Sequence, residues 1–146
     1  MEPIREDIGE LLQEYIQKEK QLLANDANEQ TLSHQLAVML GSLFRDWDVD
    51  CEYNRNRRVI KRLIYAIEPN GDAEERNVVP DIIIHRRMTS DNLIAVEIKK
   101  TTNNRSSFKD LEKLRAFKEQ LGYRESLFIR FKTGQEEVGI EELQWI

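Results

Sequence analysis

The N-terminal part of the chain has the hydrophobic spacing of amphipathic helices. Apolar residues recur there every three or four positions, as they do on the buried face of an α-helix. One helix is predicted over residues 4–23, and a second from Asp26 or Asn28 to about Arg45. The first helix is charged at most other positions, so we expect it to pack only at the edge of the domain. In the second helix, Glu29 falls near the centre of the apolar stripe.

The central part of the chain has the patterns of β-strands. Residues 49–54 alternate between apolar and polar, as in a strand with one buried face. Residues 78–86 and 93–99 are almost continuously apolar, which indicates strands covered on both faces. A tight polar turn at residues 88–92 joins these two strands and predicts a hairpin in the middle of the sheet. Residues 59–67 could form another short strand.

A helix followed by a strand is predicted in the C-terminal part. The helix covers residues 108–121 and ends at Gly122, a residue type favoured after the last helical turn. The strand over residues 126–131 should run parallel to strand 93–99, because a helix connects them. Residues 138–146 could add an edge strand. These elements predict an α/β fold, with a central mixed sheet of about four or five strands flanked by helices on both faces.

Length and composition favour one globular domain. The chain has 146 residues, of which 40% are hydrophobic and 34% are charged. We expect an N-terminal helix (1–25), a core (26–131) and a C-terminal tail (132–146). No apolar run approaches the ~20 residues that cross a membrane, and the start of the chain is acidic and polar, unlike a secretory signal. The single cysteine, Cys51, cannot form an intramolecular disulfide. A cytoplasmic protein without a membrane partner is therefore expected.

Two carboxylates interrupt the apolar hairpin. Asp81 lies near the start of its first strand and Glu97 near the end of its second, so the two can be cross-strand neighbours. Adjacent carboxylates repel each other unless a cation lies between them or one is protonated. Their oxygens, together with the backbone carbonyl of Ile98, suit Mg²⁺ or Mn²⁺. The hairpin therefore predicts a site for a divalent metal ion.

Lys99 adds a cation to this site. It follows Glu97 by two residues and so points to the same face of the strand. An ammonium there can orient or deprotonate an attacking water and offset developing negative charge. The alternative is that Glu97 and Lys99 form only a surface ion pair, and that Asp81 has a purely structural role. Because charges in apolar strands are seldom buried unless paired, the combination favours the functional interpretation.

The stretches 79–84 (VPDIII) and 96–100 (VEIKK) resemble the motif of the PD-(D/E)XK nuclease superfamily. The order of elements, with a helix, a strand, the strand pair, a helix and a strand, also fits that superfamily. The resemblance covers about residues 29–131 and implies a restriction-endonuclease-like core. A narrower resemblance, which supplies no substrate, links the chain to a group of small uncharacterised bacterial proteins of this superfamily through residues 49–55, 80–87 and 92–100.

The resemblance implies roles for particular residues. Asp81 and Glu97 would be metal ligands, and Lys99 would be the catalytic lysine. Many members also place an acidic residue on the first core helix near the metal, and Glu29 matches that position. Glu29 could instead complete a capping box with Asp26, which lies three residues earlier, and the two roles are compatible.

Two further residues have a functional and a structural interpretation. His34 lies well off the apolar stripe of its helix, so we expect it to be exposed and not catalytic. Lys113, on the helix over residues 108–121, could face the cleft, as polar residues there do in some relatives. We expect it on a solvated helix face instead.

The function favoured by these residues is divalent-metal-dependent hydrolysis of phosphodiester bonds in nucleic acid, with DNA preferred to RNA. The net charge of −5 argues mildly against nucleic-acid binding, but the middle of the chain is locally basic. The alternative is a non-catalytic module of the same fold, which binds a partner or regulates a defence or mobile-element system. A homodimer would help double-strand cleavage, and a separate protein could supply target recognition. The cations expected to contact the phosphate backbone are Arg55, Arg57, Arg58, Lys61, Arg62, Lys100 and Arg105.

The basic segment generates a testable prediction. Five cations lie between residues 55 and 62 of a net acidic chain. If they neutralise phosphates, affinity for nucleic acid should fall steeply with salt, with a logarithmic slope of about −0.9 per phosphate contact on duplex DNA. Fluorescence anisotropy of labelled DNA and RNA over a salt series measures this slope. Salt-independent binding, or no binding at low salt, would favour the protein-partner alternative.

Overall fold

Five strands form one mixed sheet in the order β1-β2-β3-β4-β5. The structure, a computed structural model, describes residues 2–51 and 80–146. Strands β3 and β4 are parallel, and the other neighbouring strands are antiparallel. The predicted α/β fold, its central hairpin and its parallel strand pair are therefore confirmed. The strands are β1 (Asp48–Cys51), β2 (Ile82–His85), β3 (Asn92–Lys100), β4 (Glu125–Lys132) and β5 (Gly139–Trp145).

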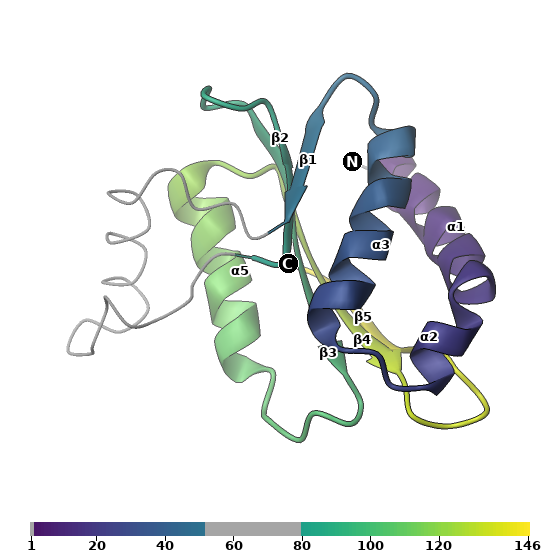
Figure 1. Cartoon of the computed structure of the whole chain (residues 1–146). Coiled ribbons are helices and arrows are strands. Elements are labelled where there is room, and N and C mark those ends of the chain that lie inside the picture. Colours follow the sequence, from purple (N-terminus) through teal and green to yellow (C-terminus); the bar gives the residue numbers. More distant parts are fainter. Residues whose placement is uncertain (1, 52–79) are drawn as a thin grey trace.

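Helices cover both faces of this sheet (Figure 1). Helices α1 (Glu2–Lys18), α2 (Lys20–Ala24) and α3 (Glu29–Leu43) lie on one side, and α5 (Phe108–Leu121) lies on the other. Helix α5 ends at Gly122, whose φ of 71° lies in the left-handed region that glycine adopts without a steric cost. The predicted helix over residues 108–121 is thus confirmed at both ends.

Strand alternation divides the core into two hydrophobic clusters. Ile82, Val96 and Ile98 face the side of α1 and α3, and they belong to the larger cluster. Ile83 and Ala95 face α5 and belong to the smaller one. Because side chains alternate along a strand, the odd-numbered residues at the end of β3 point toward α5. This alternation decides on which face the charged residues of β3 are buried.

The prediction that the first helix packs only at the edge of the domain is wrong. Five of its apolar side chains are buried in the larger cluster. Tyr15 is completely buried, and its hydroxyl donates a 2.8 Å hydrogen bond to the carbonyl oxygen of Leu32 on α3. The charged residues occupy the remaining faces of α1, so the helix combines a deeply buried stripe with a solvated surface.

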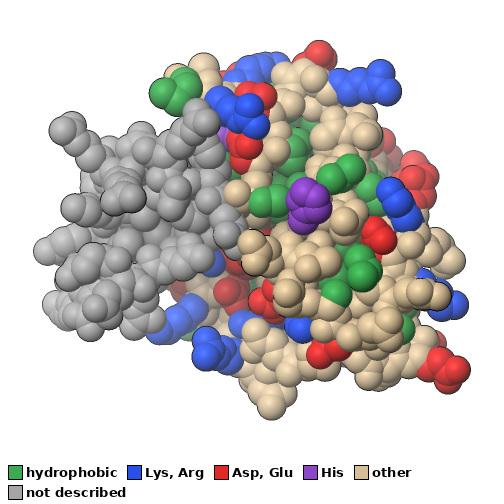
Figure 2. Space-filling view, viewed as in Figure 1, with side chains coloured by type: hydrophobic (Ala, Val, Ile, Leu, Met, Phe, Trp, Pro, Cys, Tyr) green, Lys and Arg blue, Asp and Glu red, His purple; other side chains and the backbone are tan. Residues whose placement is uncertain are grey.

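The outer surface of α3 is mixed in character. His34 is exposed, as predicted, and so are the large apolar side chains of Val38 and Leu43. Figure 2 shows hydrophobic side chains at the surface in this part of the molecule, with acidic and basic side chains around them.

Within the described residues, no helix is long and apolar enough to cross a membrane. The strand predicted over residues 59–67 lies outside the described residues.

Candidate functional site

Strand β3 extends beyond its neighbour β2, and this overhang positions the candidate site. The first residue of β2, Ile82, pairs with Val96, so the end of β3 continues without β2 beside it. Backbone N–H groups on such an edge need acceptors when they are buried. The N–H of Ile98 donates to Asp81 Oδ2 at 2.8 Å, and the N–H of Lys100 donates to Glu29 Oε2 at 3.1 Å. Two carboxylates thus accept the hydrogen bonds of these N–H groups beyond the start of β2.

This edge brings the predicted oxygen donors into one region. Residues 98 and 100 lie two positions apart in β3, so the accepting oxygens of Asp81 and Glu29 are spaced by about 7 Å along the strand. The carbonyl of Ile98 opens on the same edge as its N–H, because both groups of a strand residue point to the same side. Asp81 and the Ile98 carbonyl are therefore neighbours, and Glu29 lies further toward the end of β3.

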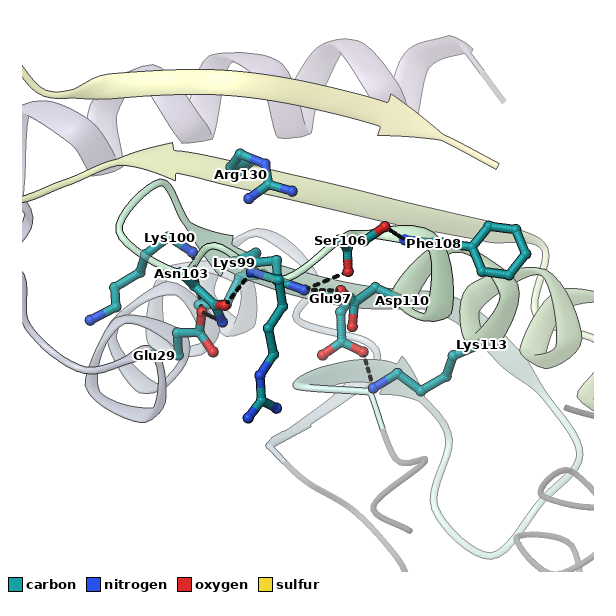
Figure 3. Close-up of polar contacts among 12 residues, drawn as sticks. Glu29, Glu97, Lys99, Lys100, Asn103, Ser106, Phe108, Asp110, Lys113 and Arg130 are labelled. Carbon is teal, nitrogen blue, oxygen red and sulfur yellow. Dashed lines mark hydrogen bonds and ion pairs between the residues drawn. The ribbon is translucent and has the colours of Figure 1, made fainter. Parts of the chain in front are cut away.

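Glu97 is buried between β3 and α5, with only 5% of its surface exposed. Its Oε2 forms an ion pair with Lys113 Nζ but has no hydrogen-bond partner of normal geometry within the described part of the chain (Figure 3). Burial raises the pKa of the Glu97 carboxyl well above its usual value, and the neighbouring Asp81 carboxylate raises it further. Lys113 opposes both effects without cancelling them. Burial and the neighbouring carboxylate therefore favour the protonated form of Glu97.

Lys99 is also buried, and it does not pair with Glu97. Its Nζ lies 2.6 Å from Asp110 Oδ2 and donates to the carbonyl oxygen of Ser106 at 3.1 Å. Asp110 belongs to the first turn of α5, and Ser106 to the loop before it (Figure 3). The structural alternative, a surface ion pair between Glu97 and Lys99, is therefore not what the structure shows, because each residue pairs with α5 instead.

The prediction that Lys113 lies on a solvated helix face is wrong, and Asp110 was not anticipated. The side chain of Lys113 is 13% exposed and contacts Glu97. Asp110, Leu114 and Phe117 are spaced by four and three residues, and Leu114 and Phe117 are buried. Lys113 lies four residues before Phe117. Helical spacing alone therefore places Asp110 and Lys113 beside the apolar stripe, and this spacing could have predicted that both are partly buried.

Glu29 does not form the capping box with Asp26 that was one of its two predicted roles. The N-cap of α3 is Asn28, whose side chain accepts a 2.7 Å hydrogen bond from the N–H of Thr31. Glu29 is the first helical residue and reaches across to β3. Besides the N–H of Lys100, its Oε2 accepts a long hydrogen bond of 3.5 Å from the side chain of Asn103.

The cations predicted to contact nucleic acid have different surroundings. Lys100 Nζ lies 3.2 Å from Asp26 Oδ1, and the Lys100 side chain is only 16% exposed. Hydrogen bonds from Thr102 and Thr133 hold the pKa of Asp26 below its usual range, which favours the carboxylate that Lys100 contacts. Arg105 is exposed. The other five predicted contacts lie outside the described residues, namely Arg55, Arg57, Arg58, Lys61 and Arg62.

The oxygen donors suit a hard divalent cation, although they are not arranged as a complete metal site. No group of three or more His, Cys, Asp or Glu side chains among residues 2–51 and 80–146 has the geometry to hold a metal ion. Lys113 contacts Glu97 Oε2, and the Ile98 N–H is bonded to Asp81. The buried Glu97 oxygen and the raised pKa nevertheless indicate a place where added positive charge would be favourable. Two carboxylates and a carbonyl are also the donors that Mg²⁺ and Mn²⁺ accept.

Comparison with protein-family models, curated proteins and solved structures finds no match to this chain.

The raised pKa of Glu97 predicts a pH dependence of stability. The folded state keeps a proton on Glu97 that the unfolded chain releases near its usual pKa of 4.5. The contribution of this group to stability is complete below that pH and is lost as pH rises through the raised folded pKa. Glu97→Gln cannot ionise, so its stability relative to the natural protein should increase as pH rises from about 4.5. Urea unfolding in EDTA over a pH series measures the difference.

A matched control is Glu112→Gln, which removes a 40%-exposed glutamate of α5. It should show no comparable trend, because an exposed carboxylate has a smaller desolvation cost. If the difference between Glu97→Gln and the natural protein does not change with pH, the buried carboxyl does not hold its proton as inferred.

Proposed function

We propose that this protein is a divalent-metal-dependent nuclease that hydrolyses phosphodiester bonds of nucleic acid, with a core of the PD-(D/E)XK kind. The observation that carries the proposal is the convergence of Asp81, Glu97 and Lys99 at the overhanging end of β3. Asp81 binds the N–H of Ile98, and Glu97 and Lys99 are buried on the α5 side of the strand. The hairpin β2–β3, followed by α5 and the parallel strand β4, supports a restriction-endonuclease-like core.

Asp81, Glu97 and the Ile98 carbonyl would hold Mg²⁺ or Mn²⁺. Glu29 would lie beside them, where it accepts a hydrogen bond from the N–H of Lys100 on the same edge of β3. When bound, such an ion lowers the pKa of a coordinated water and polarises a phosphate oxygen. The chain supplies the position of the carboxylates. Asp81 is fixed by a backbone hydrogen bond, which costs little entropy to maintain because β3 is rigid within the sheet.

Lys99 is the residue proposed to act on the reacting groups. Asp110 and the carbonyl of Ser106 hold its ammonium in one place, so its charge is oriented before any substrate arrives. In a buried site with low dielectric response, a fixed cation stabilises developing negative charge more than a mobile one in water. Lys99 would orient the attacking water and offset charge on the phosphate. The exposed Arg105, with the basic segment of residues 55–62, would meet the nucleic-acid backbone.

One observation favours the non-catalytic alternative. Glu97 and Lys99 already have partners on α5, so both side chains are paired within the protein without a metal ion. A fold that keeps such pairs could bind a protein partner or nucleic acid without cutting it, and the net charge of −5 agrees with a protein partner. Metal binding and cleavage decide between the two functions.

Titration calorimetry with Mn²⁺ tests the metal site. The natural protein should release or absorb heat on binding, and Asp81→Ala should lose most of this heat, because one of two converging carboxylates is gone. Asp46→Ala is the matched control, since it removes an exposed aspartate and should leave binding unchanged. Equal heats for the natural protein and Asp81→Ala would exclude the site.

Cleavage assays test the role of Lys99. An ammonium is not a ligand for a hard cation, so Lys99→Ala should bind Mn²⁺ with natural or slightly higher affinity. Cleavage of mixed DNA and RNA substrates should fall by at least ~100-fold, the usual scale for a positioned acid–base or electrostatic group. Lys132→Ala, a change on the neighbouring strand β4, controls for loss of positive charge.

Melting curves run beside the assay separate this role from a structural one. If Lys99 only neutralises Asp110, its removal lowers stability and leaves the cleavage rate of folded protein unchanged. If the natural protein with Mg²⁺ or Mn²⁺ cuts no substrate, single- or double-stranded, the non-catalytic alternative replaces the enzyme.

A further inference from the structure

Two buried ion pairs connect β3 to α5, and they have opposite polarity. On β3 the acid is Glu97 and the base is Lys99, two residues later. On α5 the acid is Asp110 and the base is Lys113, three residues later. Glu97 contacts Lys113 and Lys99 contacts Asp110, so the helix places a complementary charge against each charge of the strand (Figure 3).

The pair between Glu97 and Lys113 lies beside a second carboxyl group. Asp81 interacts electrostatically with Glu97, while Lys113 Nζ contacts Glu97 Oε2. Both members of the pair are largely buried, with the Glu97 side chain 6% and the Lys113 side chain 13% exposed. Water therefore screens their interaction weakly, and any other cation at this place must compete with Lys113 directly.

The contacted atom belongs to a carboxyl group that the proposed metal site requires. Lys113 Nζ lies against Oε2 of Glu97, an oxygen that is fully buried. An ammonium and a divalent cation cannot both be in contact with this oxygen at short range, because like charges repel strongly in a buried setting. Lys113 therefore occupies the electrostatic position that a divalent cation would take.

We propose that Lys113 is the resident counter-cation of the Asp81–Glu97 pair, and that its displacement from Glu97 sets the affinity of the site for divalent cations. This inference rests on the proposed function, since it assigns a competitor to the proposed metal site. In the metal-free protein Lys113 keeps the two carboxyl groups together. On metal binding its ammonium leaves Oε2, and the cost of that separation lowers the observed affinity.

The structure offers Lys113 a second acceptor. Asp110 lies one helical turn before it on the same face of α5, within the range in which helical side chains interact. A lysine side chain has a flexible four-carbon stem, so its ammonium can move toward Asp110 without a change in the helix. Asp110 is therefore a positioning residue for Lys99 in the metal-free protein and a shared anchor for both lysines once Lys113 has moved.

Mn²⁺ calorimetry on the full chain at fixed pH and low salt tests the proposal. Lys113→Met keeps the length and most of the apolar stem but removes the charge. It should bind Mn²⁺ at least about tenfold more tightly than the natural protein, which corresponds to about 1.4 kcal/mol. Lys113→Arg retains a competing charge and Lys109→Met removes an exposed charge from the same helix, so both should stay within about threefold of the natural affinity.

Unfolding in EDTA provides a readout that does not depend on metal binding. Lys113→Met should be less stable than the natural protein without metal, because the two carboxyl groups lose their counter-cation. Saturating Mn²⁺ should reduce or reverse that difference, since a ligand that binds more tightly to the folded variant stabilises it more. If Lys113→Met is too unstable to titrate, the rise in melting temperature with Mn²⁺ is compared for Lys113→Gln, and a larger rise than in the natural protein is expected.

The possible failures have different meanings. If the natural protein and Lys113→Met bind Mn²⁺ equally, and both lose binding on Asp81→Ala, the role of Lys113 is excluded while the metal site stands. If Mn²⁺ binds to Lys113→Met but not to the natural protein, competition by Lys113 is supported, while the metal-dependent function proposed for the natural protein is excluded. If neither binds Mn²⁺, the metal site and the role of Lys113 are both excluded.

Discussion

The overhang of β3 beyond β2 is the constraint on which the candidate site depends. Because β2 begins opposite Val96, the N–H groups of Ile98 and Lys100 lie beyond the part of β3 that pairs with β2. A buried N–H without an acceptor costs roughly 1–3 kcal/mol, so the fold must supply oxygens at these two points. It supplies the carboxylates of Asp81 and Glu29, which come from different elements of the chain. The need to complete a strand edge thus gathers two carboxylates at the end of β3.

Burial of charge between β3 and α5 follows from the same geometry. Glu97 and Lys99 point toward α5 because strand side chains alternate. On the helix, Lys113 pairs with Glu97 and Asp110 pairs with Lys99. Such pairs are a weak means of stabilisation, because desolvation offsets much of their attraction and apolar replacements are often at least as stable. Removing one partner, however, leaves an uncompensated charge and costs about 3–5 kcal/mol.

Sequence reasoning was accurate where one local periodicity determines the outcome. The helix of residues 108–121, the hairpin of β2 and β3 and the parallel partner β4 all follow from spacing and turn residues. Prediction from the sequence failed where the burial of a residue depends on the element that packs against it. The charged faces of α1 suggested an edge position, although its apolar stripe fills the larger cluster. Lys113 looked like a surface residue because the acid that it contacts is on another element.

The sequence by itself determined the alternation that places Glu97 and Lys99 on one face of β3, and the hairpin that brings Asp81 beside Glu97. These are properties of neighbours along the chain or across one turn. Only the tertiary structure decided which charges meet. Lys99 pairs with Asp110, Glu97 with Lys113, and Glu29 with the N–H of Lys100. The reason is physical: Coulomb interactions in a buried region depend on distance in space and on desolvation, and neither can be obtained from spacing along the chain.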